Sequence, residues 1–256
     1  FKSIKKPKTF SQKIYYLRDK YDQNDLASIV ADKYGVREYV INLGLSDILN
    51  SIYGVYKNAR EIDIEKLPNK FVAKTNHSSG TNIIVKDKDK INISTFKNQL
   101  DTWLKENYSF KTGEMQYKNI EPKIIIEKYL SDTTKYKYLQ DYQIWCFSGE
   151  PLFFSTHRYI NINDDEILQR FAYGLNWEKI DIFNDTCDIS IEKPINLGKM
   201  IENAKILAKP FSFARIDFYD LGKKIVLGEI TLTPTGGNNS YLTEKAQKKY
   251  GEKIIL

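Results

Sequence analysis

The 256-residue sequence is poor in cysteine and histidine, with two of each. Cys146 and Cys187 lie far apart and lack metal-ligand spacing, and His77 and His157 are not spaced as a metal-binding pair. This usage favours a reduced, cytoplasmic protein.

Long hydrophobic runs are also absent. No stretch approaches the ~18 apolar residues of a membrane span, and no signal peptide is visible. The signatures of a P-loop (G-x-x-x-x-G-K-S/T), of a dinucleotide-binding turn (G-x-G-x-x-G) and of a nucleophile elbow (G-x-S-x-G) are missing as well. A P-loop or dinucleotide-binding protein is therefore disfavoured.

Acidic and basic residues are mixed along the chain, and neither sign strongly predominates. Lys and Arg number 39 against 33 Asp and Glu, which gives a net charge of +6. The basic residues are scattered apart from KSIKKPK near the N-terminus, and no nucleic-acid-binding motif is visible. The balance permits an anionic ligand such as a nucleotide, and no nucleic acid partner is expected.

Helical and β-type patterns divide the chain near Leu67-Pro68. Residues 9–66 have apolar side chains at helical spacing and predict short helices, with a short helix or turn through ILNSIYGVY. The later residues predict strands or hairpins at 71–75, 82–87, 122–130, 141–160 and 211–233, and helices at 94–110, 196–211 and 243–254. Residues 131–140 and 161–195 are expected to be loops or insertions. This order predicts an α+β fold with helices on mostly antiparallel sheets.

Charged residues stand inside two apolar runs of FSFARIDFYDLGKKIVLGEITLTPTGG (211–237). Alternation along strands puts Arg215 and Asp217 on one face of the first run and Glu229 and Thr231 on one face of the second. A register with Arg215 opposite Glu229, through a loop of about five residues, would bring all four together. The cluster fits either a magnesium site beside a phosphate-binding arginine or an ion-pair ladder on a solvated sheet face.

A turn of small residues follows a strand in KFVAKTNHSSGTNIIVKD (70–87). Lys74 ends the strand, and Ser78, Ser79 and Gly80 form the turn. Backbone N–H groups of such a turn can cradle phosphate, and a nearby lysine adds positive charge. An ordinary β-hairpin with a polar tip would explain the same residues.

Two further segments carry weaker signals. Glu127 closes the apolar run IIIEKYL and could accept a hydrogen bond from an adenine amino group, or simply mark a strand leaving the core. In ADKYGVREYV, Lys33 and Arg37 are four residues apart and share a helix face, which is typical of a solvated basic surface.

The order of these segments resembles the ATP-grasp superfamily, and D-alanine–D-alanine ligases carry the same succession. The order begins with a helix that contains DK…R. A strand that ends in Lys and is followed by a small-residue loop comes next, and then a strand that ends in Glu. The last two motifs are R-x-D and E-x-T-x-x-P-x-G. Within the superfamily the chain is most similar to TupA-like ATP-grasp proteins, which are linked to teichuronopeptide and cell-surface polysaccharide synthesis. The matching pieces cover almost the whole chain: PKTFSQKIYYL, DKYGVREYV, LPNKFVAKTNHSSGTNIIV, DYQIWCFSGEP, KPINLGKMIENAKILAKPFSFARIDFYD and GEITLTPTGG.

The resemblance implies an ATP-grasp fold, in which two α+β lobes hold ATP between them. It implies a helical segment over 1–66, a first lobe over 67–130 and a second lobe over 131–256. It also implies roles for residues in the nucleotide site: Lys74 and Arg37 at the phosphates, Ser78, Ser79 and Gly80 in the lid, Glu127 at the adenine amino group, Lys128, Tyr129 and Leu130 at the ring, and Asp141 at the ribose.

The same resemblance implies a catalytic and metal-binding hairpin. Asp217 and Glu229, with Thr231, would hold Mg²⁺, and Arg215, together with Lys74, would stabilise the anionic intermediate. Thr231 stands where many ATP-grasp ligases have the Asn of E-x-N, so the second metal site departs from the pattern. The candidate substrate contacts are His157, Arg158 and Lys193.

The implied activity is ATP-dependent ligation of a carboxylate and an amine through an acyl phosphate. A uronic acid or amino acid on a cell-surface polysaccharide precursor is the expected substrate. Two alternatives remain open at this point. One is an ATP-dependent phosphotransferase that acts on a sugar-type acceptor, and the other is a non-catalytic nucleotide-binding component of a polysaccharide assembly complex.

Overall fold

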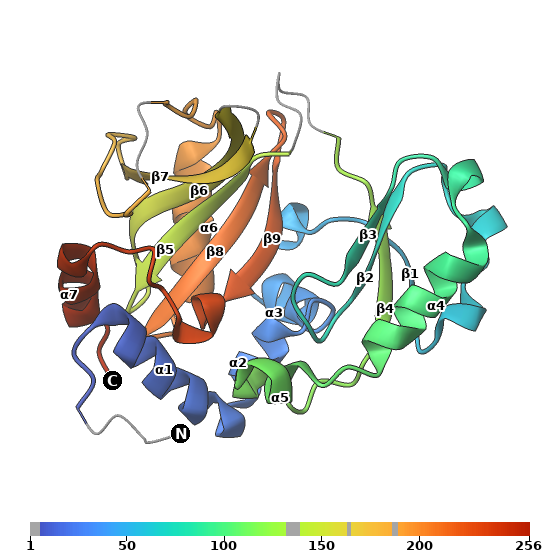
Figure 1. The fold of residues 1–256 in the computed structure, drawn as a ribbon, viewed down its shortest axis with the longest axis horizontal. Helices are drawn as coiled ribbons and strands as arrows, with labels where there is room; N and C mark the ends of the chain where they lie inside the picture. Colours follow the sequence, from blue (N-terminus) through green and yellow to red (C-terminus); the bar gives the residue numbers. More distant parts are fainter. Residues whose placement is uncertain (1–5, 132–138, 163–164, 186–188) are drawn as a thin grey trace.

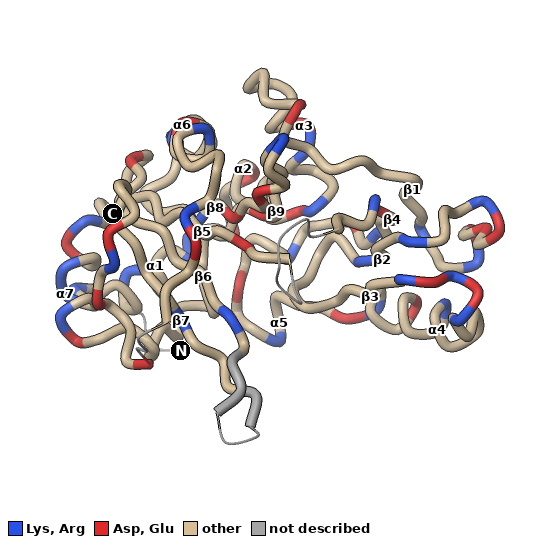
Figure 2. Tube along the Cα trace, turned by 90° about the horizontal axis from the view of Figure 1, so that it is seen from above, with Lys and Arg blue, Asp and Glu red and all other residues tan. Residues whose placement is uncertain are grey.

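The computed structural model describes residues 6–131, 139–162, 165–185 and 189–256. Two antiparallel sheets stand beside each other, and each forms the centre of one lobe (Figure 1). This is the α+β arrangement that the sequence predicts. Seen from above, acidic and basic positions are interspersed over both lobes rather than separated by sign (Figure 2). Among the helices in these ranges, none is both long and apolar enough to cross a membrane.

The first lobe is built on a four-stranded sheet in the order β1-β4-β2-β3. Its strands are β1 (Ile52–Tyr56), β2 (Phe71–Thr75), β3 (Asn82–Val85) and β4 (Ile124–Lys128). Alternate residues of β2 and β4, such as Phe71 and Ile124, form a small core with α4 (Ile93–Leu104). The intervening residues point to the opposite face, and Lys74 and Glu127 among them border a cavity shared with the second lobe.

The second lobe is built on a five-stranded sheet in the order β7-β6-β5-β8-β9. Its strands are β5 (Asp141–Phe147), β6 (Glu150–Ile162), β7 (Asp165–Gly174), β8 (Phe213–Asp220) and β9 (Ile225–Thr231). The helix α6 (Leu197–Ala208) covers one face, and its buried Met200 and Leu207 join the core of this lobe.

The opposite face of the second sheet is divided into a covered and an open part. At one end the sheet is covered by α1 (Phe10–Lys20) and α7 (Glu244–Lys253). The ring centroids of Phe10 and Trp145 lie 5.3 Å apart, and those of Tyr250 and Phe153 lie 4.7 Å apart. Such aromatic pairs fix the helices on the sheet. The other end carries polar residues and borders the first lobe.

The N-terminal helices belong to the core of the second lobe. Buried residues of α1, α2 (Asp25–Ala31) and α3 (Val36–Asn42) share one hydrophobic cluster with the second sheet. Residues 52–56, expected as a helix or turn, instead form β1, which pairs with β4. The segment 1–66 is therefore not wholly helical, because it also supplies an edge strand of the first lobe.

Most other elements lie where the sequence predicts them. The helix expected over 94–110 is divided into α4, which Asn92 caps, and α5 (Tyr108–Thr112). The segment 161–195, expected to be loops, contains β7, which pairs with β6 along a long ladder. Most of the loop expected over 131–140 lies outside the described residues.

Candidate active site

A cavity of about 340 Å³ lies between the two sheets. Its apolar walls include Val72 and Ile84 from the first lobe and Leu227 from the second. Its polar edge holds Lys74 and Glu127, whose Nζ and Oε2 atoms are 2.9 Å apart. The predicted ring-binding residues also line this cavity: Lys128, Tyr129 and Leu130. An apolar slot with a few polar groups at its edge is suited to a flat aromatic base.

Lys33, rather than Arg37, faces the site. Arg37 Nη1 donates to the Asn50 carbonyl at 2.8 Å, and Asn50 Nδ2 donates to the Lys128 carbonyl at 2.9 Å, so Arg37 supports the cavity from behind. Lys33 Nζ donates to the Ser78 carbonyl. Burial lowers the pKa of Lys33, against the opposing field of Glu229. The sequence motif that contains both residues identified the region, but the prediction placed the phosphate contact on Arg37.

The turn after β2 is anchored at its base and exposed only at its tip. Ser78 is fully buried, and its hydroxyl forms hydrogen bonds with those of Thr75 at 2.8 Å and Thr81 at 2.5 Å. Ser79 and Gly80 are exposed, and Gly80 has a φ of 76°, which glycine adopts without strain. Of the three predicted lid residues, Ser79 and Gly80 therefore form the free tip, whereas the Ser78 side chain faces inward.

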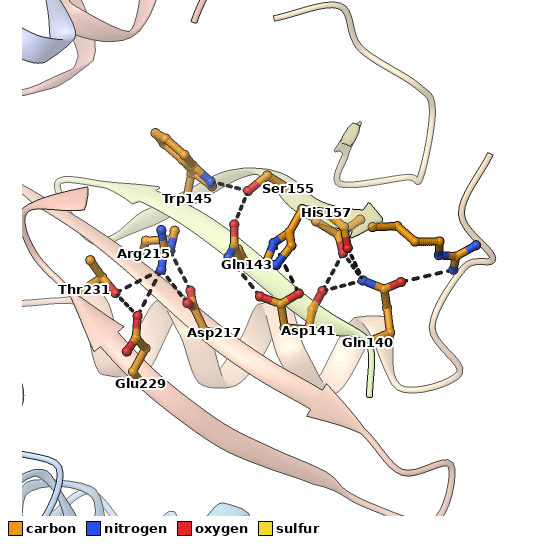
Figure 3. Close-up of polar contacts among 12 residues, drawn as sticks. Gln140, Asp141, Gln143, Trp145, Ser155, His157, Arg215, Asp217, Glu229 and Thr231 are labelled. Carbon is orange, nitrogen blue, oxygen red and sulfur yellow. Dashed lines mark hydrogen bonds and ion pairs between the residues drawn. The ribbon is translucent and has the colours of Figure 1, made fainter. Parts of the chain in front are cut away.

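The β8–β9 hairpin brings Arg215, Asp217, Glu229 and Thr231 onto one face (Figure 3). The register pairs Asp217 with Glu229 and Arg215 with Thr231, so the expected pairing of Arg215 with Glu229 is wrong. A bulge next to Asp217 and a turn over 221–224 shift the ladder. The expected convergence of the four side chains is nevertheless present.

Arg215 is the centre of this cluster. Its Nε and Nη2 atoms donate to the two Asp217 carboxylate oxygens at 2.8 and 2.6 Å, and Nη2 also donates to Glu229 Oε1 at 3.0 Å. Thr231 Oγ1 accepts from Nη2 at 3.2 Å and donates to Glu229 Oε1 at 2.7 Å. The Arg215 and Asp217 side chains are 14% and 9% exposed, so this is not a ladder on a solvated surface.

Burial and close charges shift the pKa values in this cluster. Burial raises the pKa of Asp217, against the opposing positive charge of Arg215. Burial would also raise the pKa of Glu229, but the positive charges of Arg215 and Lys33 outweigh burial and lower the pKa of that carboxyl. For Arg215, burial is outweighed by Asp217 and Glu229, which raise its pKa. Opposite shifts in neighbouring carboxyl groups are typical of functional sites.

Arg215 also borders two further cavities. The Glu114 cavity, about 560 Å³, is lined by residues of α1, α5 and β9 together with Glu114, Ser79 and Thr233. The His157 cavity, about 210 Å³, lies over β5, β6 and β7 and is lined by apolar residues such as Phe183 and by polar residues that include His157 and Arg170. Arg215 thus stands where two compartments meet. Glu114 was not predicted from the sequence, because it lies outside every recognisable motif.

The remaining predicted residues are distributed unevenly around the site. Asp141 does not line the cavity between the sheets; its Oδ1 lies 3.7 Å from His157 Nδ1, and Gln143 Nε2 donates to its Oδ2 at 2.9 Å (Figure 3). Arg158 Nη2 donates to Gln140 Oε1 at 3.1 Å, and Lys193 is exposed in the segment before α6. Of the three candidate substrate contacts, only His157 lines a described cavity that Arg215 borders.

Asp217 and Glu229 are the two carboxylates that the sequence predicts as magnesium ligands. Within the described ranges, no group of three His, Cys, Asp or Glu side chains is placed to hold a metal ion. Mg²⁺ at nucleotide sites often takes only one or two protein carboxylates, and phosphates and water complete its shell. The two facing carboxylates fit this pattern. The Thr231 hydroxyl is already engaged with Glu229 and Arg215.

The fold is that of the ATP-grasp proteins. The structure of D-alanine–D-alanine ligase from Bacillus anthracis is similar, with a TM-score of 0.52 and 17% identity over 88% of this chain and 63% of that one. The same ligase complexed with ATP gives a TM-score of 0.55 and 18% identity over 89% and 65% of the two chains. The present chain thus spans less than two thirds of the length of these ligases.

A family model identifies the family of this chain. The chain belongs to the TupA-like ATP-grasp family, whose model matches residues 12–255. This confirms the resemblance seen in the sequence. No match is found among curated proteins.

Proposed function

We propose that this chain is an ATP-dependent carboxylate–amine ligase that acts through an acyl phosphate. The observation that carries the proposal is the position of Arg215, which contacts two acidic residues and borders two cavities. Such a ligase must bring a nucleotide phosphate, a carboxylate and an amine to one point. Membership of the ATP-grasp family supports the nucleotide part of this assignment.

In this proposal the cavity between the sheets holds the adenine. Glu127 and the backbone after it would meet the base, and Lys74 and Lys33 would offset the phosphate charge. The exposed tip at Ser79 and Gly80 would close over the phosphates and exclude water from the acyl phosphate. Magnesium held by Asp217 and Glu229 would offset phosphate charge as well.

The proposed chemistry has two steps. A carboxylate oxygen attacks the γ-phosphorus of ATP, and ADP leaves with the electron pair of the broken phosphorus–oxygen bond. The amine nitrogen then attacks the carbonyl carbon, a carbon–nitrogen bond forms, phosphate leaves with the electrons of its bond to carbon, and the nitrogen loses a proton. The Arg215 guanidinium would stabilise the negative oxygen of the tetrahedral intermediate.

We also propose that the carboxylate belongs to a cell-surface polysaccharide precursor, either as a uronic acid or as an attached amino acid. The family resemblance and the polar residues that line the two cavities support this class of substrate.

A trapping assay tests the proposed function. The protein is incubated with ATP, Mg²⁺, a panel of uronic and amino acids, and hydroxylamine, which converts an acyl phosphate to a hydroxamate. ADP release and a hydroxamate that both depend on the carboxylate are the expected result, with mass spectrometry of the product. A phosphorylated sugar formed without any amine would indicate a phosphotransferase. ATP binding without turnover across the panel would indicate a non-catalytic nucleotide-binding protein.

A further inference from the structure

The Glu114 cavity contains a carboxyl group that the nucleotide chemistry does not use. Glu114 lies between α5 and β4 and is 6% exposed. Thr233 Oγ1 donates to Glu114 Oε1 at 2.6 Å, and Gln116 Nε2 donates to Thr233 Oγ1 at 2.6 Å. These buried hydrogen bonds hold the carboxyl group in one orientation at the cavity wall.

The cation that acts on Glu114 is Arg18, whose positive charge opposes the rise in the Glu114 pKa. The other acidic residues of the site have direct ion pairs. Glu127 is paired with Lys74 at 2.9 Å, and Asp217 is paired with Arg215 at 2.6 Å. Arg18, which also lines the cavity, directs Nη1 to the carbonyls of Thr112 and Gly236, each at 3.1 Å. Burial raises the pKa of Glu114. A ligand ammonium in the cavity would give Glu114 a direct ion pair.

Hydroxyl groups make up much of the remaining wall. Tyr108 and Tyr117 pack edge to face with ring centroids 5.0 Å apart, and Ser79, Thr112 and Thr235 lie around the same cavity. Burial, followed by the Glu114 carboxylate, raises the pKa of Tyr108 to about 12, so its hydroxyl keeps its proton. Hydroxyl groups both donate and accept, as a polyhydroxylated ligand requires.

The His157 cavity differs from the Glu114 cavity in its charged residues. It is lined by Arg170, Arg215 and His157, and no Asp or Glu is among the described residues that line it. Arg170 is paired with Asp185, and Arg215 lines both cavities. The difference therefore lies in Glu114 and Glu229, which line only the Glu114 cavity, beside Arg18 and Arg215. These two acidic side chains favour the Glu114 cavity for the amine substrate of a carboxylate–amine ligase.

We propose that the Glu114 cavity is the amine-substrate site, that its ligand is a primary amine on a hydroxyl-bearing skeleton of amino-sugar type, and that Glu114 receives the ammonium group. The assignment of this amine as the attacking nucleophile rests on the proposed ligase function. The cavity extends to Arg215 and Glu229, so a bound amine would lie beside the residue proposed to stabilise the tetrahedral oxygen.

Ligand-observed saturation-transfer NMR tests the site directly. The probes are D-glucosamine and D-glucose, which differ in the amine, and the proteins are wild type, Glu114→Gln and Glu65→Gln, an exposed control. Glucosamine should bind wild type and the control alike and more tightly than glucose, and Glu114→Gln should weaken glucosamine at least tenfold. Equal binding of the two sugars by wild type, or unchanged glucosamine binding by Glu114→Gln, would overturn the proposal.

A second variant provides an independent test in case Glu114→Gln misfolds. Tyr108→Phe removes one hydroxyl from the cavity wall and keeps the ring contact with Tyr117. It should weaken glucosamine several-fold while the thermal unfolding temperature stays near that of wild type. Unchanged affinity in a correctly folded Tyr108→Phe protein would count against the cavity as the binding site.

The hydroxamate assay separates this inference from the proposed function. Hydroxamate formation without Glu114-dependent glucosamine binding would leave the ligase standing and remove the amine site. Glu114-dependent glucosamine binding without any hydroxamate would support the amine site and contradict the acyl-phosphate mechanism.

Discussion

Asp217 and Glu229 lie directly opposite each other on β8 and β9, and the guanidinium of Arg215 contacts both. Two carboxylates this close repel each other unless a cation lies between them. Arg215 supplies that cation in the structure, and Mg²⁺ would add a second one when nucleotide binds. The three residues should therefore behave as one unit when any of them is changed.

Loss of either carboxylate should remove turnover. Asp217→Asn and Glu229→Gln keep the shape of the side chain but remove a charge that offsets Arg215 and binds the metal. We expect ADP release to fall ~100-fold or more, with stability lowered by about 1–3 kcal/mol because hydrogen bonds to charged groups are weakened. ADP assays and urea unfolding measure the two effects. Asp181→Asn, at an exposed position, is the control, and wild-type turnover in both variants would refute the metal assignment.

Removal of Lys74 should act mainly on nucleotide binding. Its Nζ atom lies beside Glu127 at the edge of the cavity between the sheets, where a phosphate can be reached. We expect Lys74→Ala to weaken ATP at least tenfold, equivalent to ~1.4 kcal/mol, by isothermal titration calorimetry. Lys70→Ala, an exposed lysine just before β2, should bind ATP as wild type does. Equal affinities of the two variants would contradict the phosphate role of Lys74.

His77 should make stability depend on pH below neutrality. Burial lowers its pKa, and its Nε2 donates to the Glu106 carbonyl at 3.1 Å. The unfolded chain takes up a proton near pH ~6.5, whereas the folded protein does so at lower pH. The stabilising contribution is therefore complete above that pH and is lost as pH falls through the folded pKa.

Urea unfolding of wild type and His77→Gln at pH 7.5, 6 and 5 tests this expectation. Gln keeps a hydrogen-bond donor but does not titrate in this range. Wild type should lose more stability than the variant as pH falls. Parallel pH profiles would show that another group is responsible.

The Cys146 thiol should resist modification in the folded protein. It is fully buried between β5 and α6, and burial raises its pKa, so little thiolate is present. Iodoacetamide labelling followed by peptide mass spectrometry should show Cys146 labelled only in denaturant. Labelling at the rate of a free thiol in the native protein would mean that this part of the core opens readily.

The sequence predicted the fold correctly wherever apolar residues form a distinct run or recur at helical spacing. The short apolar runs of β2 and β4 and the helical spacing of α1 indicated the correct elements. β1 was missed because it is a short edge strand whose residues are only partly buried or exposed, so no strong alternation marks it. β7 was missed because polar residues interrupt its apolar positions in DEILQRFAYG, and its pairing with β6 depends on tertiary structure.

The site was predictable at the level of its residues but not of its contacts. The motif order identified the Arg215 cluster, yet a bulge beside Asp217 fixed a register that alternation alone could not supply. Lys33 and Arg37 share a motif, and only the break between α2 and α3 decides which of them faces Ser78. Glu114 carries no sequence signal, because its importance comes from Thr233, which is more than one hundred positions away in the chain.

The path of the N-terminal residues has a consequence for any attempt to divide this protein. The first three helices complete the core of the second lobe, and β1 then forms an edge of the first sheet before the chain returns after β4. The second lobe is therefore not a single continuous stretch of sequence, and the first lobe begins at β1, inside the segment predicted to be helical. A fragment starting at residue 67 would lose Phe10 and Ile14 from one core and the edge strand β1 from the other sheet, so truncation at the predicted boundary should destabilise both lobes at once.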